Sequence, residues 1–134
     1  MKKVNLLLLI TPKTQVACLN TNMNVRQALE KMRAHGYSAI PMINNDGEYM
    51  GTVAEGDLLW QIVKNEKISL EDLEYIQLVD LPRKSDMPAV KVDASSEELV
   101  AQITNHNFIP VVDDRNVLMG IVTRRKVMQE LIEK

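Results

Sequence analysis

Apolar and polar positions follow two different periods along the chain, and each period predicts a type of secondary structure. Between residues 24 and 35 the apolar side chains recur three and four positions apart, which is the spacing of an amphipathic helix with one buried face. Residues 40–53 instead form two apolar runs around the polar turn 44–47, which predicts a β-hairpin. A second helical pattern then continues to residue 64.

The same succession occurs a second time. Residues 40–64 align without gaps with residues 109–133, and residues 24–35 align with residues 95–106. The second copy is two residues shorter between these blocks, because "HGYSAIP" in the first copy corresponds to "HNFIP" in the second. The chain is therefore a tandem repeat.

Short strands are expected before each copy, around residues 15–19 and 89–92, so each copy is predicted to be a β-α-β-β-α unit. Both first helices begin with a capping box, formed by Asn24 with Gln27 and by Ser95 with Glu98. The fold class is α/β (α+β), and because such small units are marginal alone, the two copies are expected to share a core. The predicted organisation is residues 1–64 as the first repeat with its N-terminal segment, 65–86 as a linker with a short helix from residue 69 to 76, and 87–134 as the second repeat.

Composition and charge narrow the possible partners. With 46% apolar residues the chain of 134 residues can bury a core, and a net charge of -2 without a basic block argues against nucleic acid. The apolar run of residues 4–10 is too short for a membrane span and is broken by Thr11-Pro12-Lys13, so we expect it to pack on the protein itself in a cytoplasmic protein. Cys18 is the only cysteine, which excludes an internal disulfide.

The segments "SAIPMINNDGEYMGTVAEGDLL" and "FIPVVDDRNVLMGIVTRRKVM" resemble the signature of CBS domains. The resemblance covers nearly the whole chain. It implies that the two repeats pack as a pseudo-twofold pair with two clefts between them, and that such pairs form homodimers. It also implies that the clefts bind an adenosine derivative (AMP, ADP, ATP, S-adenosylmethionine, NAD or cyclic di-AMP) and thereby regulate another protein. The adenine nucleotide would then be a regulatory ligand, with no cofactor required.

In the family motif, a Thr or Ser hydroxyl and an Asp three residues later contact the ligand, with the Asp accepting hydrogen bonds from the ribose. A carboxylate suits a vicinal diol because its two oxygens can accept both hydrogen bonds. The first repeat keeps the carboxylate, as Asp57, without the hydroxyl; the second keeps the hydroxyl, as Thr123, with Lys126 in place of the carboxylate. Two structural roles remain open: Asp57 also suits a first helical turn, and Thr123 also suits an N-cap.

Lys126 lies in the first turn of a helix, where a cation is unfavourable unless something compensates. Glu130, one turn later, is one candidate. A bound phosphate is the other, because Arg124, Arg125 and Lys126 would add positive charge to free backbone amides.

The resemblance also implies contacts to the adenine base from the strands beside each cleft. In the first repeat and the leading segments these are Thr14, Gln15, Ala17, Ser38, Ala39, Ile40 and Pro88, and in the second repeat Asn107, Phe108 and Ile109. Phe108 suits either base stacking or the core. Because the shorter loop of the second repeat falls in this wall, we expect the cleft with Asp57 to be the better nucleoside site and the edge with Lys126 to supply charge or to bind a different ligand.

Nothing in the sequence favours an enzyme. His35 and His106 lie at equivalent helix ends without a neighbouring nucleophile, and the acids at positions 46, 113 and 114 lie in turns, where Asp is common for backbone reasons. The alternative to a nucleotide sensor is a scaffold for dimerisation or protein interaction whose nucleotide sites are degenerate and empty.

Overall fold

The computed structural model describes residues 4–64, 69–83 and 87–132, and it consists of two compact units. The first unit is residues 17–86. The second unit combines residues 1–16 with residues 87–134. The mixed α/β class predicted from the sequence is confirmed in both units.

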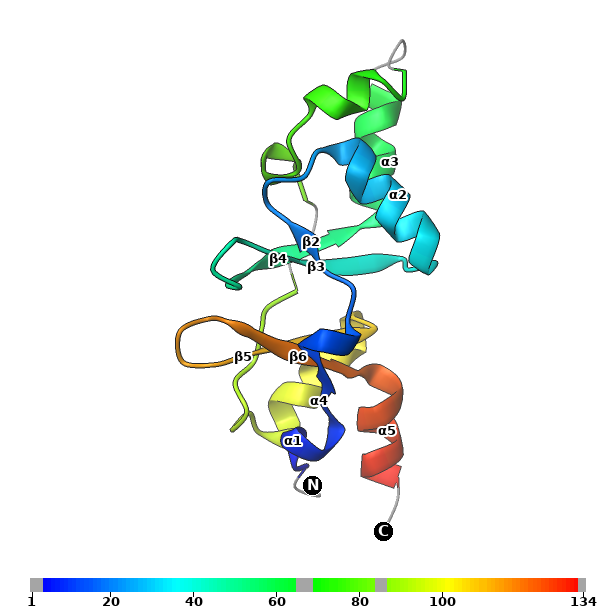
Figure 1. The fold of residues 1–134 in the computed structure, drawn as a ribbon. Helices are drawn as coiled ribbons and strands as arrows, with labels where there is room; N and C mark the ends of the chain where they lie inside the picture. The colour runs from blue at the N-terminus through cyan, green and yellow to red at the C-terminus, as the bar shows by residue number, and fades with distance from the viewer. Residues whose placement is uncertain (1–3, 65–68, 84–86, 133–134) are drawn as a thin grey trace. The chain divides into compact units, whose positions relative to one another are not determined.

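The first unit is built on a three-stranded sheet in the order β2-β3-β4. Its strands are β2 (Leu19–Asn20), β3 (Ala39–Ile43) and β4 (Tyr49–Ala54). Strand β2 is parallel to β3, while β3 and β4 form the predicted antiparallel hairpin. The helices α2 (Val25–His35) and α3 (Glu55–Lys64) lie on the same side of this sheet (Figure 1).

The second unit repeats the hairpin of the first, but its third strand lies at the other edge of the hairpin, which gives a sheet in the order β1-β6-β5. Its strands are β1 (Thr11–Pro12), β5 (Phe108–Val112) and β6 (Leu118–Thr123), and its helices are α1 (Leu6–Leu9), η1 (Lys13–Gln15), α4 (Ser96–Asn105) and α5 (Arg124–Ile132). All neighbouring strands in this sheet are antiparallel. An isolated parallel bridge joins Val90 to Val111.

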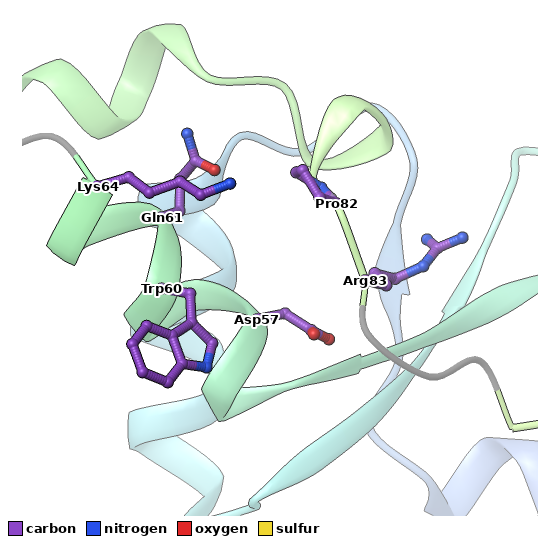
Figure 2. A pocket seen from close by; sticks show the side chains of 6 residues that line it. All are labelled: Asp57, Trp60, Gln61, Lys64, Pro82 and Arg83. Atoms are coloured by element: carbon purple, nitrogen blue, oxygen red, sulfur yellow. The ribbon is translucent and has the colours of Figure 1, made fainter.

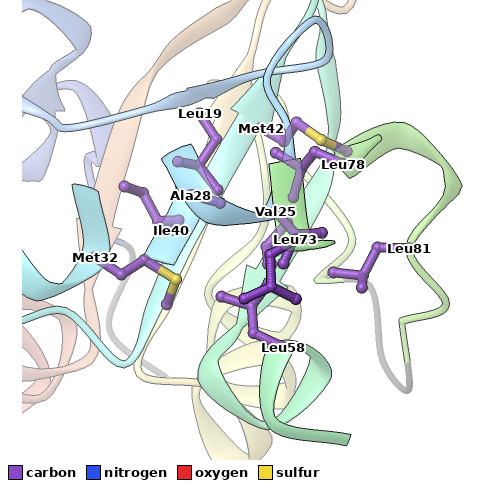
Figure 3. Packing of buried hydrophobic residues seen from close by; sticks show 11 residues of the cluster. Leu19, Val25, Ala28, Met32, Ile40, Met42, Leu58, Leu73, Leu78 and Leu81 are labelled. Atoms are coloured by element: carbon purple, nitrogen blue, oxygen red, sulfur yellow. The ribbon is translucent and has the colours of Figure 1, made fainter. Parts of the chain in front are cut away.

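Each unit has a hydrophobic cluster of its own. In the first unit the predicted buried face of α2 packs on the sheet (Figure 3), and the cluster comprises Leu19, Val25, Ala28, Met32, Ile40, Met42, Val53, Leu58, Leu73, Leu78 and Leu81. The last three come from the segment that the sequence predicts to be a linker. It contains two short 3-10 helices, η2 (Asp72–Tyr75) and η3 (Leu78–Asp80), whose leucines are buried in the core of the first unit.

The N-terminal segment packs into the second unit, which differs from the predicted boundary that groups it with the first repeat. Val4 and Leu6 are buried in the hydrophobic cluster of the second unit, and the Val4 amide donates to the buried Ser96 hydroxyl at 3.1 Å. Strand β1 pairs with β6 so closely that a Cβ on Gly120 would overlap the Thr11 carbonyl oxygen. The aligned blocks of the two copies do not include residues 1–16, so the repeat pattern predicts nothing about this packing.

Side-chain caps mark the start of the first helix in each repeat. Both hydrogen bonds of the Asn24–Gln27 capping box are present, and Ser95 accepts the Glu98 amide at 3.1 Å. The leading strands are shorter than predicted: the region 15–19 contributes only Leu19 to β2, and the region 89–92 contributes only the bridge at Val90. Among the described residues no helix is long and apolar enough to cross a membrane.

Candidate functional site

The predicted ligand-binding residues divide between the two units. The first unit contains Ala17, Ser38, Ala39, Ile40 and Asp57, and the second contains Thr14, Gln15, Pro88, Asn107, Phe108, Ile109, Thr123, Arg124 and Lys126. Thr14 and Gln15 therefore lie in the same unit as the Thr123–Lys126 turn, on η1, which packs beside β6. Both side chains are exposed.

Asp57 lies where β4 runs directly into α3. It is only 7% exposed, and its Oδ2 accepts the Ala54 amide at 2.9 Å, which ties the first turn of the helix to the last residue of the strand. The Glu55 amide donates to the Ser38 carbonyl at 2.8 Å, so the start of α3 is also held to the start of β3. These two hydrogen bonds hold the first turn of α3, and with it Asp57, next to the strand residues that are expected to contact the base.

A pocket with a volume of about 290 Å³ opens beside Asp57 (Figure 2). One face of α3 forms a side of it and the segment after η3 forms the other, with the lining residues Asp57, Trp60, Gln61, Lys64, Pro82 and Arg83. The side chains of Asp57, Gln61 and Lys64 extend from the helix toward that segment. The pocket therefore combines one carboxylate, two cations and an indole.

Sequence reasoning selected only Asp57 from this pocket. The helical spacing 57, 60, 61, 64 was an available signal that Trp60, Gln61 and Lys64 share its face. Pro82 and Arg83 gave no such signal, because their position depends on how the segment after η3 folds back.

The strand residues of the first unit differ in what they can offer to a ligand. Ile40 is fully buried in the hydrophobic cluster, so only its backbone remains for contacts. Ser38 is exposed, while Ala17 and Ala39 are half-buried. Ser38 is therefore the one of these four residues with an exposed polar side chain.

In the second unit, Thr123 caps α5, because its Oγ1 accepts the Lys126 amide at 3.2 Å. The N-cap interpretation of Thr123 is therefore confirmed. The Lys126 side chain contacts the N-terminal segment, where its Nζ donates to Thr11 Oγ1 at 3.2 Å. A hydroxyl oxygen thus accepts a hydrogen bond from the cation that replaces the carboxylate of the first repeat.

Arg124 is anchored to the loop before β5. Its amide donates to the Asn107 carbonyl at 2.8 Å and its Nε to the His106 carbonyl at 3.2 Å. The hydrogen bond from the Arg124 amide to the Asn107 carbonyl corresponds to the one from the Glu55 amide to the Ser38 carbonyl in the first unit. Ser38 and Asn107 are therefore structurally equivalent. The two residues that the second repeat lacks fall between the end of the first helix and Asn107. Helix α2 is capped by Gly36 with a positive φ of 68°, whereas α4 is capped by His106 with an extended φ of -134°.

The remaining residues of the second wall differ in exposure. Ile109 is fully buried in the second cluster, and Phe108 is 8% exposed, as a core residue would be. Asn107 and Pro88 are exposed.

The two helix starts carry opposite charge. The first turn of α3 contains Glu55 and Asp57, whereas the first turn of α5 contains Arg124, Arg125 and Lys126 and no acidic residue. Because a helix N-terminus already favours anions, the α5 turn is suited to phosphate. Within the described ranges, no group of His, Cys, Asp or Glu is arranged to hold a metal ion.

Comparison with known proteins agrees with the repeat. The family model for the CBS domain matches residues 9–64 and 79–133. Cyclic di-AMP receptor B of Bacillus subtilis is 27% identical over 117 residues, which cover 87% of this chain and 79% of that protein.

Solved structures agree over nearly the full length. CbpB of Listeria monocytogenes in complex with c-di-AMP has a TM-score of 0.84 at 27% identity, covering 96% of this chain and 95% of that one. A hypothetical conserved protein of Geobacillus kaustophilus has a TM-score of 0.85 at 27% identity, with 97% of both chains covered.

Proposed function

This chain belongs to the CBS domain family, and from that premise we propose that it is a regulatory module that binds an adenine nucleotide, with cyclic di-AMP as its ligand. Its role is to sense this ligand rather than to catalyse a reaction. The observation that carries the proposal is the likeness, over most of both chains, to the receptors of Bacillus and Listeria that bind this nucleotide.

The first turn of α5 supports this ligand chemically. Cyclic di-AMP has two phosphodiester groups, each with one negative charge, and its 3′ oxygens are esterified, so it has no vicinal diol. Arg124, Arg125 and Lys126 place three cations at a helix N-terminus, where the helix dipole also favours an anion. We assign the phosphate contacts to this turn.

The surroundings of the turn offer the remaining contacts. Thr14 and Gln15 are exposed on η1 beside β6, and the exposed Asn107 is held by its carbonyl to the Arg124 amide. We assign the base contacts to these residues and to the neighbouring backbone of β5. Pro88, which is exposed in the same unit, completes the proposed set.

The output of such a module is a change in its binding to another protein, and we propose that it works in the cytoplasm as a homodimer. Large apolar side chains remain exposed on α3 and α5, and Leu59 (55%), Val63 (54%) and Ile132 (75%) are among them. Exposed apolar side chains of this kind commonly form the surfaces that bind other proteins.

Isothermal titration with cyclic di-AMP tests the assignment. We expect the wild type to bind, and Lys126→Gln and Arg125→Gln each to weaken affinity by about tenfold, because each loses a charge-assisted contact. Lys91→Gln is the matched control: Lys91 is an exposed cation of the same unit, and it pairs with Asp114 at 3.7 Å instead. Equal affinity for all four proteins would remove the α5 turn from the site.

The empty-scaffold alternative predicts a different result. A ligand that binds only the folded state raises the unfolding midpoint by mass action. A flat thermal response to cyclic di-AMP, AMP, ATP, S-adenosylmethionine and NAD would favour a scaffold for dimerisation or protein interaction over a sensor.

A further inference from the structure

We propose that the outward-facing side chains of residues 69–80 form a docking surface for another protein, and that the segment bound there is basic with apolar anchor residues. The apolar side chains of this 69–80 surface are Leu70, Tyr75 and Val79. The proposal rests on the proposed function only in taking the output of the module to be its binding to another protein. The surface belongs to the first unit, whereas the α5 turn belongs to the second.

The backbone beneath this surface is fixed. Leu73 and Leu78 are 1% and 0% exposed and pack into the core cluster of the first unit (Figure 3). The Val25 amide donates to the Ile76 carbonyl at 2.9 Å, and the Leu78 amide donates to the Met23 carbonyl at 2.9 Å. Both hydrogen bonds tie the segment to the start of α2. Because this backbone is already ordered, it has little further conformational entropy to lose when a partner binds.

Three large apolar side chains remain outside on this fixed base. Tyr75 is 84% exposed, Leu70 is 64% exposed and Val79 is 53% exposed. Tyrosine is enriched in protein interfaces, where its ring contributes a large contact area and its hydroxyl can still form a hydrogen bond. We assign Tyr75 as the main anchor of the surface.

Acidic side chains surround these anchors. The segment contains four acidic residues and no basic residue. Glu71 and Asp80 are exposed and have no ion-pair partner within the ranges that the structure describes. Glu74 does contact a cation, since Arg26 Nη1 lies 2.8 Å from its Oε1, but Arg26 is shared with Glu30 at 3.4 Å. The surface therefore has an excess of negative charge.

The charge indicates the class of partner. A negative surface attracts a basic protein segment and repels the phosphates of nucleic acids and of anionic lipids. It also argues against a second copy of this chain. A twofold contact places the same patch on both subunits, so it would bring acid against acid. A segment of another protein in which Lys or Arg flanks apolar residues matches both properties of the surface.

NMR titration of the full chain with a synthetic amphipathic peptide of leucine and lysine tests the surface. We expect the amide signals of residues 69–80 and of the start of α2 to shift. A peptide of the same composition in scrambled order should bind more weakly, because it lacks an apolar face, and a leucine–glutamate peptide should not bind. Shifts centred elsewhere on the protein, or no shifts, would overturn the proposal.

Variants separate the apolar contribution from the charged one. Tyr75→Ala should weaken the peptide by about tenfold or more, as the loss of an interface anchor does. The double variant Glu71→Gln with Asp80→Asn should weaken it by about fivefold and make its affinity less dependent on salt. Tyr37→Ala, which alters another exposed tyrosine of the first unit, and Glu97→Gln, which alters an exposed acid of the second, should change neither quantity.

Each result has a defined meaning. Unchanged affinity in Tyr75→Ala, or an unchanged salt dependence in the double variant, contradicts the assigned contacts. Sedimentation of the same samples tests the other occupant: a dimer that dissociates in Tyr75→Ala would show that a second copy covers the surface, and would overturn the proposal. Calorimetry with cyclic di-AMP keeps the two proposals apart. Peptide binding without cyclic di-AMP binding sinks only the proposed ligand, and the reverse sinks only this docking surface.

Discussion

Asp57 and Lys126 occupy equivalent positions of the repeat and have opposite charge. Asp57 accepts a hydrogen bond from the backbone of the preceding strand, whereas the Lys126 side chain donates to Thr11 in the N-terminal segment. An acceptor can bind hydroxyls and a cation can bind phosphates, so one replacement changes the class of group that the position recognises. The sequence alone predicted this difference, because it depends on residue identity and alignment only.

Gly120 makes a testable contribution to stability. A Cβ at this position would overlap the backbone of Thr11, which belongs to a paired strand and cannot move aside cheaply. We expect Gly120→Ala to lower the free energy of unfolding by about 1–3 kcal/mol, as overpacking does. Urea denaturation measures the change.

Gly56 provides the matched control. It lies in α3, and a Cβ there would meet nothing within 4 Å. Gly56→Ala should therefore leave stability unchanged or raise it by up to about 1 kcal/mol. A similar loss in both variants would show that the close approach of β1 to β6 is not what destabilises Gly120→Ala.

Hairpins and helices were the elements that sequence patterns predicted best. Both hairpin turns fall at the predicted polar positions, with Gly47 and Asn116 in the positive-φ conformation that such turns require. The leading strands were predicted too long. Periodicity cannot limit a strand of two residues such as β2, whose length is set by its pairing with β3.

Helix α1 can be tested with a pair of identical substitutions. Leu6 is 1% exposed within the second cluster, whereas Leu8, on the same helix, is 80% exposed. We expect Leu6→Ala to lower the free energy of unfolding by about 2–5 kcal/mol, because it leaves a cavity in the core. Leu8→Ala should change it by less than about 0.5 kcal/mol. Thermal or urea unfolding distinguishes the two, and equal effects would mean that α1 does not pack as described.

At the scale of the molecule, the sequence predicted the two repeats but not how the segments outside the aligned blocks pack on them. The alignment of the two copies predicted the order of the elements. It carried no information on residues 1–16 or on the leucines of the segment 69–83, because the aligned blocks include neither segment. The pocket shows the same division. Asp57 was predicted from the motif, whereas Pro82 and Arg83 lie in a segment that the aligned blocks do not include.

Fragments of the chain test the two-unit organisation. Residues 17–86 are contiguous and include a complete cluster, so we expect this fragment to give a dispersed amide NMR spectrum. The fragment 87–134 lacks Val4, Leu6 and strand β1, and should be unfolded or only partly ordered. Addition of a peptide of residues 1–16 should restore its structure. A folded 87–134 fragment that ignores the peptide would contradict this organisation.

The placement of residues 1–16 has a consequence for biosynthesis. These residues are translated before residues 17–86, but the strands and helices that they pack against are translated after them. The first unit can fold as soon as residues 17–86 have been made, whereas Val4 and Leu6 have no core to pack into until residues 90–127 follow. Contacts between segments so far apart in sequence form slowly, so the apolar side chains of residues 4–10 are exposed during that interval.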